Sequence, residues 1–206
     1  MEPLTTDARA RYFDAKFAAD DDPWRYRDSW YERRKRDLVL AALPRARYRR
    51  AFEPGCANGE LSAQLAPRCG RLLSADFAPA ALVLAQRRVA GYPHVSVERR
   101  AMPHDWPTGR FDLIVISEFA YYLNREQCAA LADMACASLE AGGTLLCCHW
   151  RHGGEAWMLD PADVHACFDA HRELRAQTCV KDRDFLLDVW TRGDVPFDAT
   201  QPERRE

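Results

Sequence analysis

The sequence predicts an α/β fold: a seven-stranded, mostly parallel sheet with an antiparallel last hairpin, preceded by an N-terminal helical lid. Three observations support this fold class. Apolar strand-like segments alternate with helix-like segments from residue 48 onward, which is typical of a parallel sheet with right-handed crossovers. Two strand-like segments near the C-terminus have no helix between them, which predicts a hairpin. A glycine-rich turn joins the first strand of the alternating region to its first helix.

The composition fits one such domain and argues against several function classes. The chain has 206 residues and a formal net charge of -2, so no overall field recruits nucleic acid or an anionic membrane. Its eight cysteines are scattered without a C-x-x-C pair and its histidines lack ligand spacing, so we expect reduced thiols and no metal. Without a signal-like start or an apolar run of about 18 residues, the sequence predicts a cytoplasmic protein with no membrane contact.

Two helices precede the first strand and form the predicted N-terminal lid, residues 1–45. The first spans residues 6–20 and the second residues 29–43. Ser29 is expected to cap the second helix, with Glu32 in the capping-box position. Because both helices come before the first strand, we expect them to lie across the rim of the sheet where a ligand binds.

The alternating region is the main predicted domain, residues 46–195, and a polar tail follows at 196–206. Its expected strands are 48–52, 71–76, 95–98, 111–117, 144–149, 173–180 and 185–191. Its expected helices are 59–65, 79–89, 126–139 and 162–170. The fourth strand is continuously apolar, as in a central strand covered on both faces, whereas the third alternates like an edge strand.

The turn after the first strand has the pattern acid-x-Gly-x-Ala-x-Gly. Glu53 ends the strand, and Gly55 and Gly59 allow the backbone to approach a ligand or to adopt a positive φ. Ala57 occupies a position where a middle glycine would be expected, which is tolerable if its φ is negative. An acid at the carboxyl end of a parallel strand suits a ligand with hydroxyl groups or positive charge and repels a pyrophosphate.

A second acid supports a nucleoside ligand. Asp76 ends the next strand, about twenty residues after Glu53, where a carboxylate can accept hydrogen bonds from both ribose hydroxyls of an adenosine. S-adenosylmethionine and nicotinamide cofactors both carry such hydroxyls. A dinucleotide fingerprint has three glycines and no acid on its first strand, so the pattern favours S-adenosylmethionine. The alternatives are a nicotinamide-dependent oxidoreductase and a non-catalytic binding module on the same fold.

Several segments together resemble the nodulation protein S (NodS) family. They are Asp22-Pro23-Trp24, residues 29–35, residues 52–59, Ser117-Glu118 with Tyr121-Tyr122-Leu123, and His149-Trp150-Arg151. The family comprises class I S-adenosylmethionine-dependent methyltransferases of Rossmann-like fold that methylate the amino sugar of a chitooligosaccharide. The resemblance covers about residues 20–192. It implies N-methylation of a small-molecule acceptor such as an amino sugar or chitooligosaccharide amine.

The resemblance also implies which residues hold S-adenosylmethionine. Glu53, Gly55 and Gly59 are expected to frame the methionine part, and Asp76 to bind the ribose. Ala101 and Met102 are expected to flank the adenine, and Ser117 to lie under the sulfonium. Tyr31 and Arg34 are expected to close over the carboxylate of the cofactor. One position departs from many class I enzymes, because Arg100 stands where an acid precedes the adenine-flanking pair. The contact to the adenine amino group must then come from the backbone or from another residue.

Two residues at the ends of central strands are candidates for catalysis. Glu118 and His149 are expected at the rim, where they would orient and deprotonate an amine. Alternatively, Glu118 caps the following helix and His149 is a structural strand-end histidine. Tyr121, Tyr122 and Trp150 are expected to form the wall of the acceptor site, or else to be core aromatics. Methyl transfer from a sulfonium needs no metal, and alignment of the reactants contributes roughly 7 to 11 kcal/mol.

Overall fold

The computed structural model describes residues 5–155 and 157–193. Within them it confirms the predicted fold class, because seven strands form one sheet in the order β3-β2-β1-β4-β5-β7-β6. The strands are β1 (Tyr48–Pro54), β2 (Cys69–Asp76), β3 (Val95–Arg99), β4 (Phe111–Ser117), β5 (Leu139–Trp150), β6 (Leu174–Lys181) and β7 (Phe185–Arg192). The predicted polar tail at 196–206 lies outside the described residues.

The register of the sheet brings several strand ends to one rim. β1 pairs in parallel with β2 and β4, β2 with β3, and β4 with β5, whereas β7 lies antiparallel between β5 and β6. Glu53 is paired with Ser74, two residues before Asp76, so the two predicted acids lie on neighbouring strand ends. Ser117 is paired with Cys148, which places the end of β4 beside that of β5.

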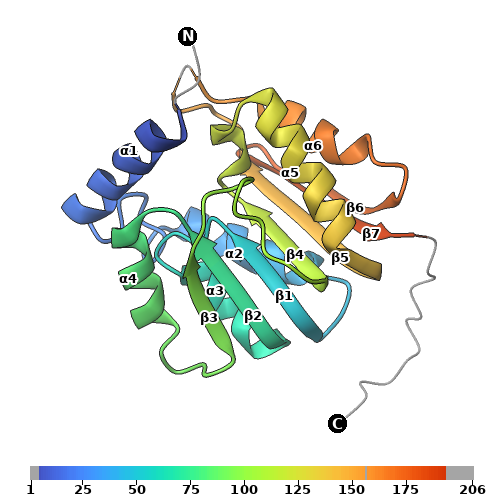
Figure 1. Cartoon of the computed structure of the whole chain (residues 1–206), viewed down its shortest axis with the longest axis horizontal. Coiled ribbons are helices and arrows are strands. Elements are labelled where there is room, and N and C mark those ends of the chain that lie inside the picture. The colour runs from blue at the N-terminus through green and yellow to red at the C-terminus, as the bar shows by residue number, and fades with distance from the viewer. Residues whose placement is uncertain (1–4, 156, 194–206) are drawn as a thin grey trace.

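Helices cover both faces of the sheet (Figure 1). They are α1 (Thr6–Ala19), α2 (Trp30–Ala42), α3 (Glu60–Leu65), α4 (Pro79–Arg88), α5 (Arg125–Ser138) and α6 (Pro161–Asp169), with short 3-10 helices η1 (Ala66–Arg68) and η2 (Ala120–Tyr122). α5 and α6 pack on one face, where Leu131 and Phe168 share a core with Ile114. α2 and α3 pack on the other, where Val39 and Leu65 share a second core.

The two N-terminal helices take different positions. α2 belongs to a helical layer of the domain, because Val39 is only 1% exposed and packs in the same core as the β4 residue Leu113. α1 lies beside α4 (Figure 1), where Phe13 and Phe17 pack against Ala78 at the end of the sheet. Of the predicted lid, α1 and the loop that follows it therefore lie at the rim, and α2 covers a face of the sheet.

Helix caps account for where the helices begin. Ser29 caps α2 as predicted, since its side chain accepts a hydrogen bond from the Glu32 backbone N–H. The Glu32 carboxylate contacts Lys35 at 3.0 Å instead of turning back to the cap. α5 begins at a full capping box made by Asn124 and Gln127, so Glu118 does not cap it.

Candidate active site

Two cavities meet at the rim where β1, β2 and β4 end. We call the first the aromatic chamber, because its walls include Phe13, Phe17, Trp24, Phe77, Phe119 and Tyr122. We call the second the polar chamber, because its walls include Glu32, Lys35, Arg36, Glu53, Asn58 and Ser117. They enclose about 750 and about 450 Å³, open solvent included. Tyr26, Gly55, Ala57 and Glu118 line both chambers and form the junction between them.

The turn between β1 and α3 forms the floor of this junction. Gly55 has a φ of 74°, and a Cβ there would lie 2.7 Å from the Phe119 ring. Gly59 has a φ of 82°, and a Cβ there would lie 2.9 Å from the Ala85 Cα. The condition under which an alanine would be unstrained at position 57, a negative φ, is not met, because the φ of Ala57 is 50°. Ala57 therefore adopts the left-handed conformation although it has a Cβ, whereas a glycine at this position would avoid the steric strain.

Glu53 is a buried acid in the wall of the polar chamber. It is 2% exposed, and its Oε2 accepts hydrogen bonds from the hydroxyls of Ser62 and of Ser74, the latter at 2.9 Å. Burial raises the pKa of this carboxyl to about 7, although the two serine hydrogen bonds act in the opposite direction. A positively charged ligand group beside Glu53 would favour its ionised form.

Asp76 is held in place by backbone donors at the edge of the aromatic chamber. Its two carboxylate oxygens accept from the N–H groups of Ala57 and Ala78, each at 3.0 Å. Burial raises the pKa of Asp76, and these backbone hydrogen bonds oppose that shift. A carboxylate has about four acceptor positions, so Asp76 can still accept from two hydroxyl groups in the chamber. Ala101 and Met102 line the same chamber, as expected for residues that flank a base.

Glu118 is the most constrained residue at the junction. It follows β4 with a φ of 59°. Its Oε2 accepts from the Tyr121 hydroxyl at 2.6 Å and from the Trp150 N–H at 3.0 Å. Its Oε1 lies 2.7 Å from Lys35 Nζ. Burial lowers the pKa of Lys35, but Glu118 and Glu32 outweigh this effect, and the net shift is upward. Glu118 is therefore held in place by two hydrogen bonds and one ion pair.

His149 does not face either chamber. Its ring is fully buried, and its Nδ1 lies 2.9 Å from Nε2 of His165. Nδ1 of His165 in turn lies 2.6 Å from Asp188 Oδ2. Burial lowers the pKa of His149 well below its usual value, so its imidazole is neutral. We therefore correct its expected role, because a histidine buried in the core does not contact an acceptor at the junction.

The positions predicted for Tyr31 and Arg34, beside the carboxylate of the cofactor, also require correction. Arg34 pairs with Asp182 at 2.6 Å, and Tyr31 packs near Phe185, so neither residue lines a chamber. Lys35 and Arg36, the next residues of the same helix, line the polar chamber instead. The positive charges that α2 presents to the site are therefore those of Lys35 and Arg36.

The predicted acceptor wall is only partly assembled. Tyr122 lines the aromatic chamber, and the ring centroid of Tyr121 lies 4.6 Å from that of Tyr122. Trp150 lines neither chamber, and its ring lies near His152. Arg100 lines the aromatic chamber and pairs with Glu98 at 2.7 Å. Trp150 therefore contacts Glu118 through its backbone N–H, while its ring lies outside both chambers.

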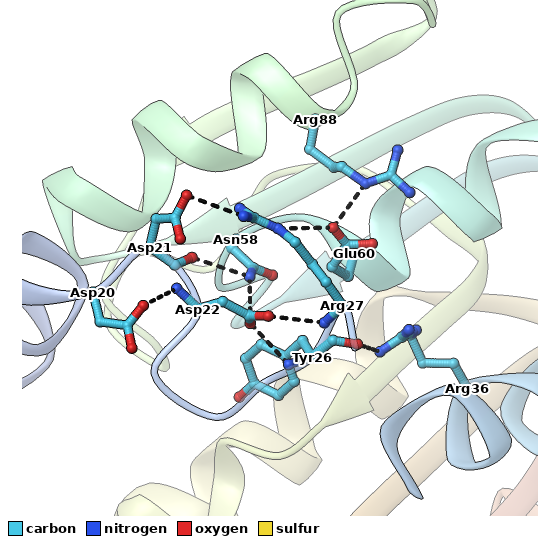
Figure 2. A network of polar contacts seen from close by, with 9 residues as sticks. All are labelled: Asp20, Asp21, Asp22, Tyr26, Arg27, Arg36, Asn58, Glu60 and Arg88. Carbon is cyan, nitrogen blue, oxygen red and sulfur yellow. Dashed lines mark hydrogen bonds and ion pairs between the residues drawn. The ribbon is translucent and has the colours of Figure 1, made fainter. Parts of the chain in front are cut away.

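A network of polar contacts that the sequence reasoning missed fastens the loop before α2 to the glycine turn (Figure 2). The Asn58 side-chain amide donates to the Asp21 carbonyl and to the Asp22 carboxylate. Asp22 also accepts from the Tyr26 N–H at 2.8 Å, and the Tyr26 carbonyl accepts from Arg36 at 2.6 Å. Asn58 inside the glycine motif and the conspicuous Asp-Pro-Trp segment were the signals from which this network could have been inferred.

The described residues contain no helix that is long and apolar enough to cross a membrane. Nor do residues 5–155 and 157–193 contain a cluster of histidine, cysteine and acidic side chains suited to a metal ion.

Comparison with known proteins decides the family. The model of the nodulation protein S (NodS) family matches residues 6–152. The chain belongs to the NodS family. It is 30% identical to nodulation protein S of Bradyrhizobium diazoefficiens over 164 residues, which cover 74% of this chain and 78% of that protein. It is 36% identical to nodulation protein S of Rhizobium tropici over 106 residues, which span 51% of this chain but only 44% of the longer relative.

Solved structures agree with the NodS assignment. NodS from Bradyrhizobium japonicum WM9, an N-methyltransferase in complex with S-adenosyl-L-homocysteine, superposes with a TM-score of 0.81 at 27% identity, covering 90% of this chain and 98% of that one. A putative methyltransferase from Pseudomonas syringae is 49% identical with a TM-score of 0.72, covering 80% of this chain and all of that one. The predicted resemblance to NodS and the Rossmann-like fold are confirmed.

Proposed function

We propose that this NodS-family chain is an S-adenosylmethionine-dependent methyltransferase that methylates the nitrogen of a small-molecule amine. One observation carries the proposal: two chambers meet at Gly55, with Asp76 in one and Glu53 in the other. S-adenosylmethionine has a matching two-part form, with ribose hydroxyls at one end and an ammonium and a carboxylate at the other. The complex of the related NodS with S-adenosyl-L-homocysteine supports the same ligand class.

The residues of each chamber suit one part of this cofactor. In the aromatic chamber, Asp76 would accept hydrogen bonds from the ribose hydroxyls, and Ala101 and Met102 would flank the adenine. In the polar chamber, Glu53 would hold the ammonium group, and Lys35 would pair with the carboxylate. The sulfur would then lie near the junction, where glycine leaves the backbone accessible.

The residues at the junction would position the acceptor nitrogen. S-adenosylmethionine supplies a methyl group on a cationic sulfur, which leaves as a neutral thioether. Glu118 presents a fixed negative charge there and favours a positively charged or polar amine, while Tyr26 lines both chambers. The nitrogen must present its lone pair in line with the methyl group, and its proton passes to water once the new bond forms. The contribution of these residues is alignment and exclusion of water.

The acceptor is an amino sugar amine or the amine of a chitooligosaccharide, the class expected from the family. The aromatic lining of the first chamber suits a sugar ring, since Phe13 and Tyr122 present apolar ring surface beside polar groups. Glu118 suits the amine. This acceptor class includes neither nucleic acid nor membrane lipid.

A ligand-binding experiment tests the proposal before any acceptor is known. S-adenosyl-L-homocysteine at about 100 times its dissociation constant stabilises a protein by about 2.7 kcal/mol, which raises the melting temperature of a domain of this size by roughly 5 to 10 °C. We expect this shift with S-adenosyl-L-homocysteine and none with NAD. Transfer of labelled methyl from S-adenosylmethionine to glucosamine then tests the reaction. No shift at millimolar S-adenosyl-L-homocysteine would overturn the proposed function.

A further inference from the structure

Arg9 brings a buried positive charge to the wall of the aromatic chamber. It lies in α1, is only 3% exposed and lines this chamber. Its Nη1 donates to the Tyr122 backbone carbonyl, and at 3.1 Å to Gln127 Oε1. Its Nη2 lies 3.4 Å from the Thr6 hydroxyl. All three acceptors are neutral.

No carboxylate of the described residues pairs with Arg9, in contrast to two other cations of the site, Lys35 and Arg100. Lys35 pairs with Glu32 and Glu118, and Arg100 pairs with Glu98. Arg36 has no ion pair either, but Glu32 and Glu60 raise its pKa against burial. Burial lowers the pKa of Arg9, and no charged group among the described residues opposes the shift. A buried charge without a counterion is destabilising, so this position favours an anion from outside the chain.

Arg9 also has hydrogen-bond donors to spare. A guanidinium has five N–H donors in a planar fork. The three hydrogen bonds use two donors of Nη1 and one of Nη2. The Nε–H and the second Nη2–H have no acceptor within residues 5–155 and 157–193. A guanidinium with two free donors is suited to a carboxylate or a phosphate, which Arg binds through paired hydrogen bonds.

The anion cannot be assigned to the cofactor proposed above. The charged end of S-adenosylmethionine would lie in the polar chamber with Glu53 and Lys35, and its adenosine end carries no negative charge. The molecule that reaches Arg9 must therefore be the acceptor. Tyr122 connects the two regions, because its carbonyl binds Arg9 and its ring contacts Tyr121, whose hydroxyl binds Glu118.

We propose that Arg9 binds an anionic group of the methyl acceptor, so that the acceptor is an amine that also carries a carboxylate or a phosphate. Glu118 then lies at the amine end of the acceptor and Arg9 at its anionic end. This inference rests on the proposed methyl transfer and narrows its substrate class. If Arg9 only held α1 to the Tyr122 carbonyl, the protein would bind neutral and anionic acceptors with equal affinity.

Calorimetric titration of the full chain saturated with S-adenosyl-L-homocysteine tests this inference. The probes share one amino sugar: glucosamine is neutral apart from its amine, glucosamine 6-phosphate adds a phosphate, and muramic acid adds a carboxylate. We expect wild type to bind at least one anionic probe at least tenfold more tightly than glucosamine. The probe that shows this preference identifies the anion as phosphate or carboxylate.

Variants assign the preference to Arg9. Arg9→Gln should lose the tenfold preference, because affinity for the anionic probe falls more than affinity for glucosamine, and Arg9→Lys should retain part of the preference because the charge remains. Arg11→Gln removes an exposed arginine from the same helix and should behave as wild type. If Arg9→Gln does not fold, the inference is still tested by the ratio of anionic-probe affinity to glucosamine affinity, measured in wild type and in Arg9→Lys.

Two results would overturn the inference. One is equal wild-type affinity for the three probes, including no binding of any. The other is a preference for the anionic probe that persists in Arg9→Gln. Methyl transfer to glucosamine without a preference for either anionic probe would remove the role of Arg9 and leave the proposed function intact. Failure to bind S-adenosyl-L-homocysteine would instead remove the proposed function and this inference with it.

Discussion

The Asn58 side-chain amide donates a 3.0 Å hydrogen bond to Asp22 Oδ1, and this bond joins the glycine turn to the loop between α1 and α2 (Figure 2). The same Asp22 oxygen accepts from the Tyr26 N–H, and its other oxygen accepts from the Arg27 N–H. The contact therefore places Tyr26 at the junction of the two chambers. Because the fastened loop is part of the wall, its position should be coupled to cofactor binding.

Asn58→Ala should weaken binding of S-adenosyl-L-homocysteine. The substitution leaves Asp22 without one of its donors and frees the loop that carries Tyr26. A lost hydrogen bond to a charged group costs about 1.5 to 3 kcal/mol, so we expect affinity to fall by roughly tenfold or more in a calorimetric titration. Asp28→Asn changes an exposed side chain in the same loop and serves as the control, with little expected change. Equal affinities of Asn58→Ala and wild type would refute the coupling.

Asp76→Asn should weaken the same complex more strongly. The amide keeps the size of the side chain but loses the charge and half of its acceptor capacity toward ribose hydroxyls. We expect a loss of roughly 10- to 100-fold in affinity, from one or two charge-assisted hydrogen bonds. Glu126→Gln, an exposed acid that lines neither chamber, is the control. If both variants bind like wild type, Asp76 has no role in holding the ribose.

Glu53 should make the ligand-free protein less stable as pH rises. Its pKa is about 7 in the folded chain, above the ordinary value of 4.5, so the folded state holds a proton that the unfolded state releases first. The free energy of unfolding should therefore fall between pH 4.5 and pH 7, by about 3 kcal/mol from this one group at 1.36 kcal/mol per pKa unit.

Urea denaturation at several pH values measures this effect. In Glu53→Gln the fall should be smaller by about this amount, because the amide does not titrate, while Asp76 and Glu32, whose pKa values are also raised, still contribute. A pH profile that is identical in the variant and in wild type would show that the Glu53 carboxyl has an ordinary pKa.

Ala57→Gly should stabilise the fold. Ala57 adopts a φ of 50°, where an L-residue with a Cβ is strained by roughly 1 to 2 kcal/mol relative to glycine. Glycine is more flexible in the unfolded chain, which offsets part of this gain. We expect a net increase of roughly 0.5 to 1 kcal/mol in the free energy of unfolding, measured by urea denaturation. Ala63→Gly, within α3, should destabilise the protein instead. A lower stability for Ala57→Gly would mean that the left-handed conformation carries no strain.

Glu118→Gln should slow methyl transfer without abolishing cofactor binding. The amide removes the negative charge that faces the junction, while Lys35 keeps its contact with Glu32. We expect the rate of transfer to a saturating amine to fall by at least tenfold, with S-adenosyl-L-homocysteine affinity changed much less. Single-turnover assays with labelled methyl donor separate the two effects. An unchanged rate would make Glu118 a purely structural group.

Much of the fold followed from the spacing of apolar segments and glycines. The central position of residues 111–117 was visible because the run is apolar on both faces. The meeting of Glu53 and Asp76 at one rim followed from their positions at the ends of consecutive parallel strands. These inferences needed only local sequence and the rules of parallel sheets.

The orientation of α2 shows what the sequence reasoning did not resolve. Arg34 and Lys35 are adjacent, and one step along a helix turns the side chain by about 100°. Only the packing of the helix decides which of them faces the site. Lys35, Val39 and Leu43 follow each other at intervals of four, and Val39 and Leu43 pack in the core, so Lys35 lies on the inward face. Applied to the sequence, this periodicity would have favoured Lys35.

The position of His149 could not be derived in the same way. Its ring is satisfied at Nδ1 by His165, which comes from α6, and His165 is held by Asp188 from β7. These three residues are brought together by the antiparallel return of β7 beside β5 and by the packing of α6. No local pattern in the sequence reports such a contact.

The crystal structure of the full chain with S-adenosyl-L-homocysteine would test the central claim most directly. We predict the ribose hydroxyls within hydrogen-bond distance of Asp76 in the aromatic chamber and the amino group beside Glu53 in the polar chamber. A complex in which the nucleoside lies elsewhere, with neither acid in contact with it, would contradict the account.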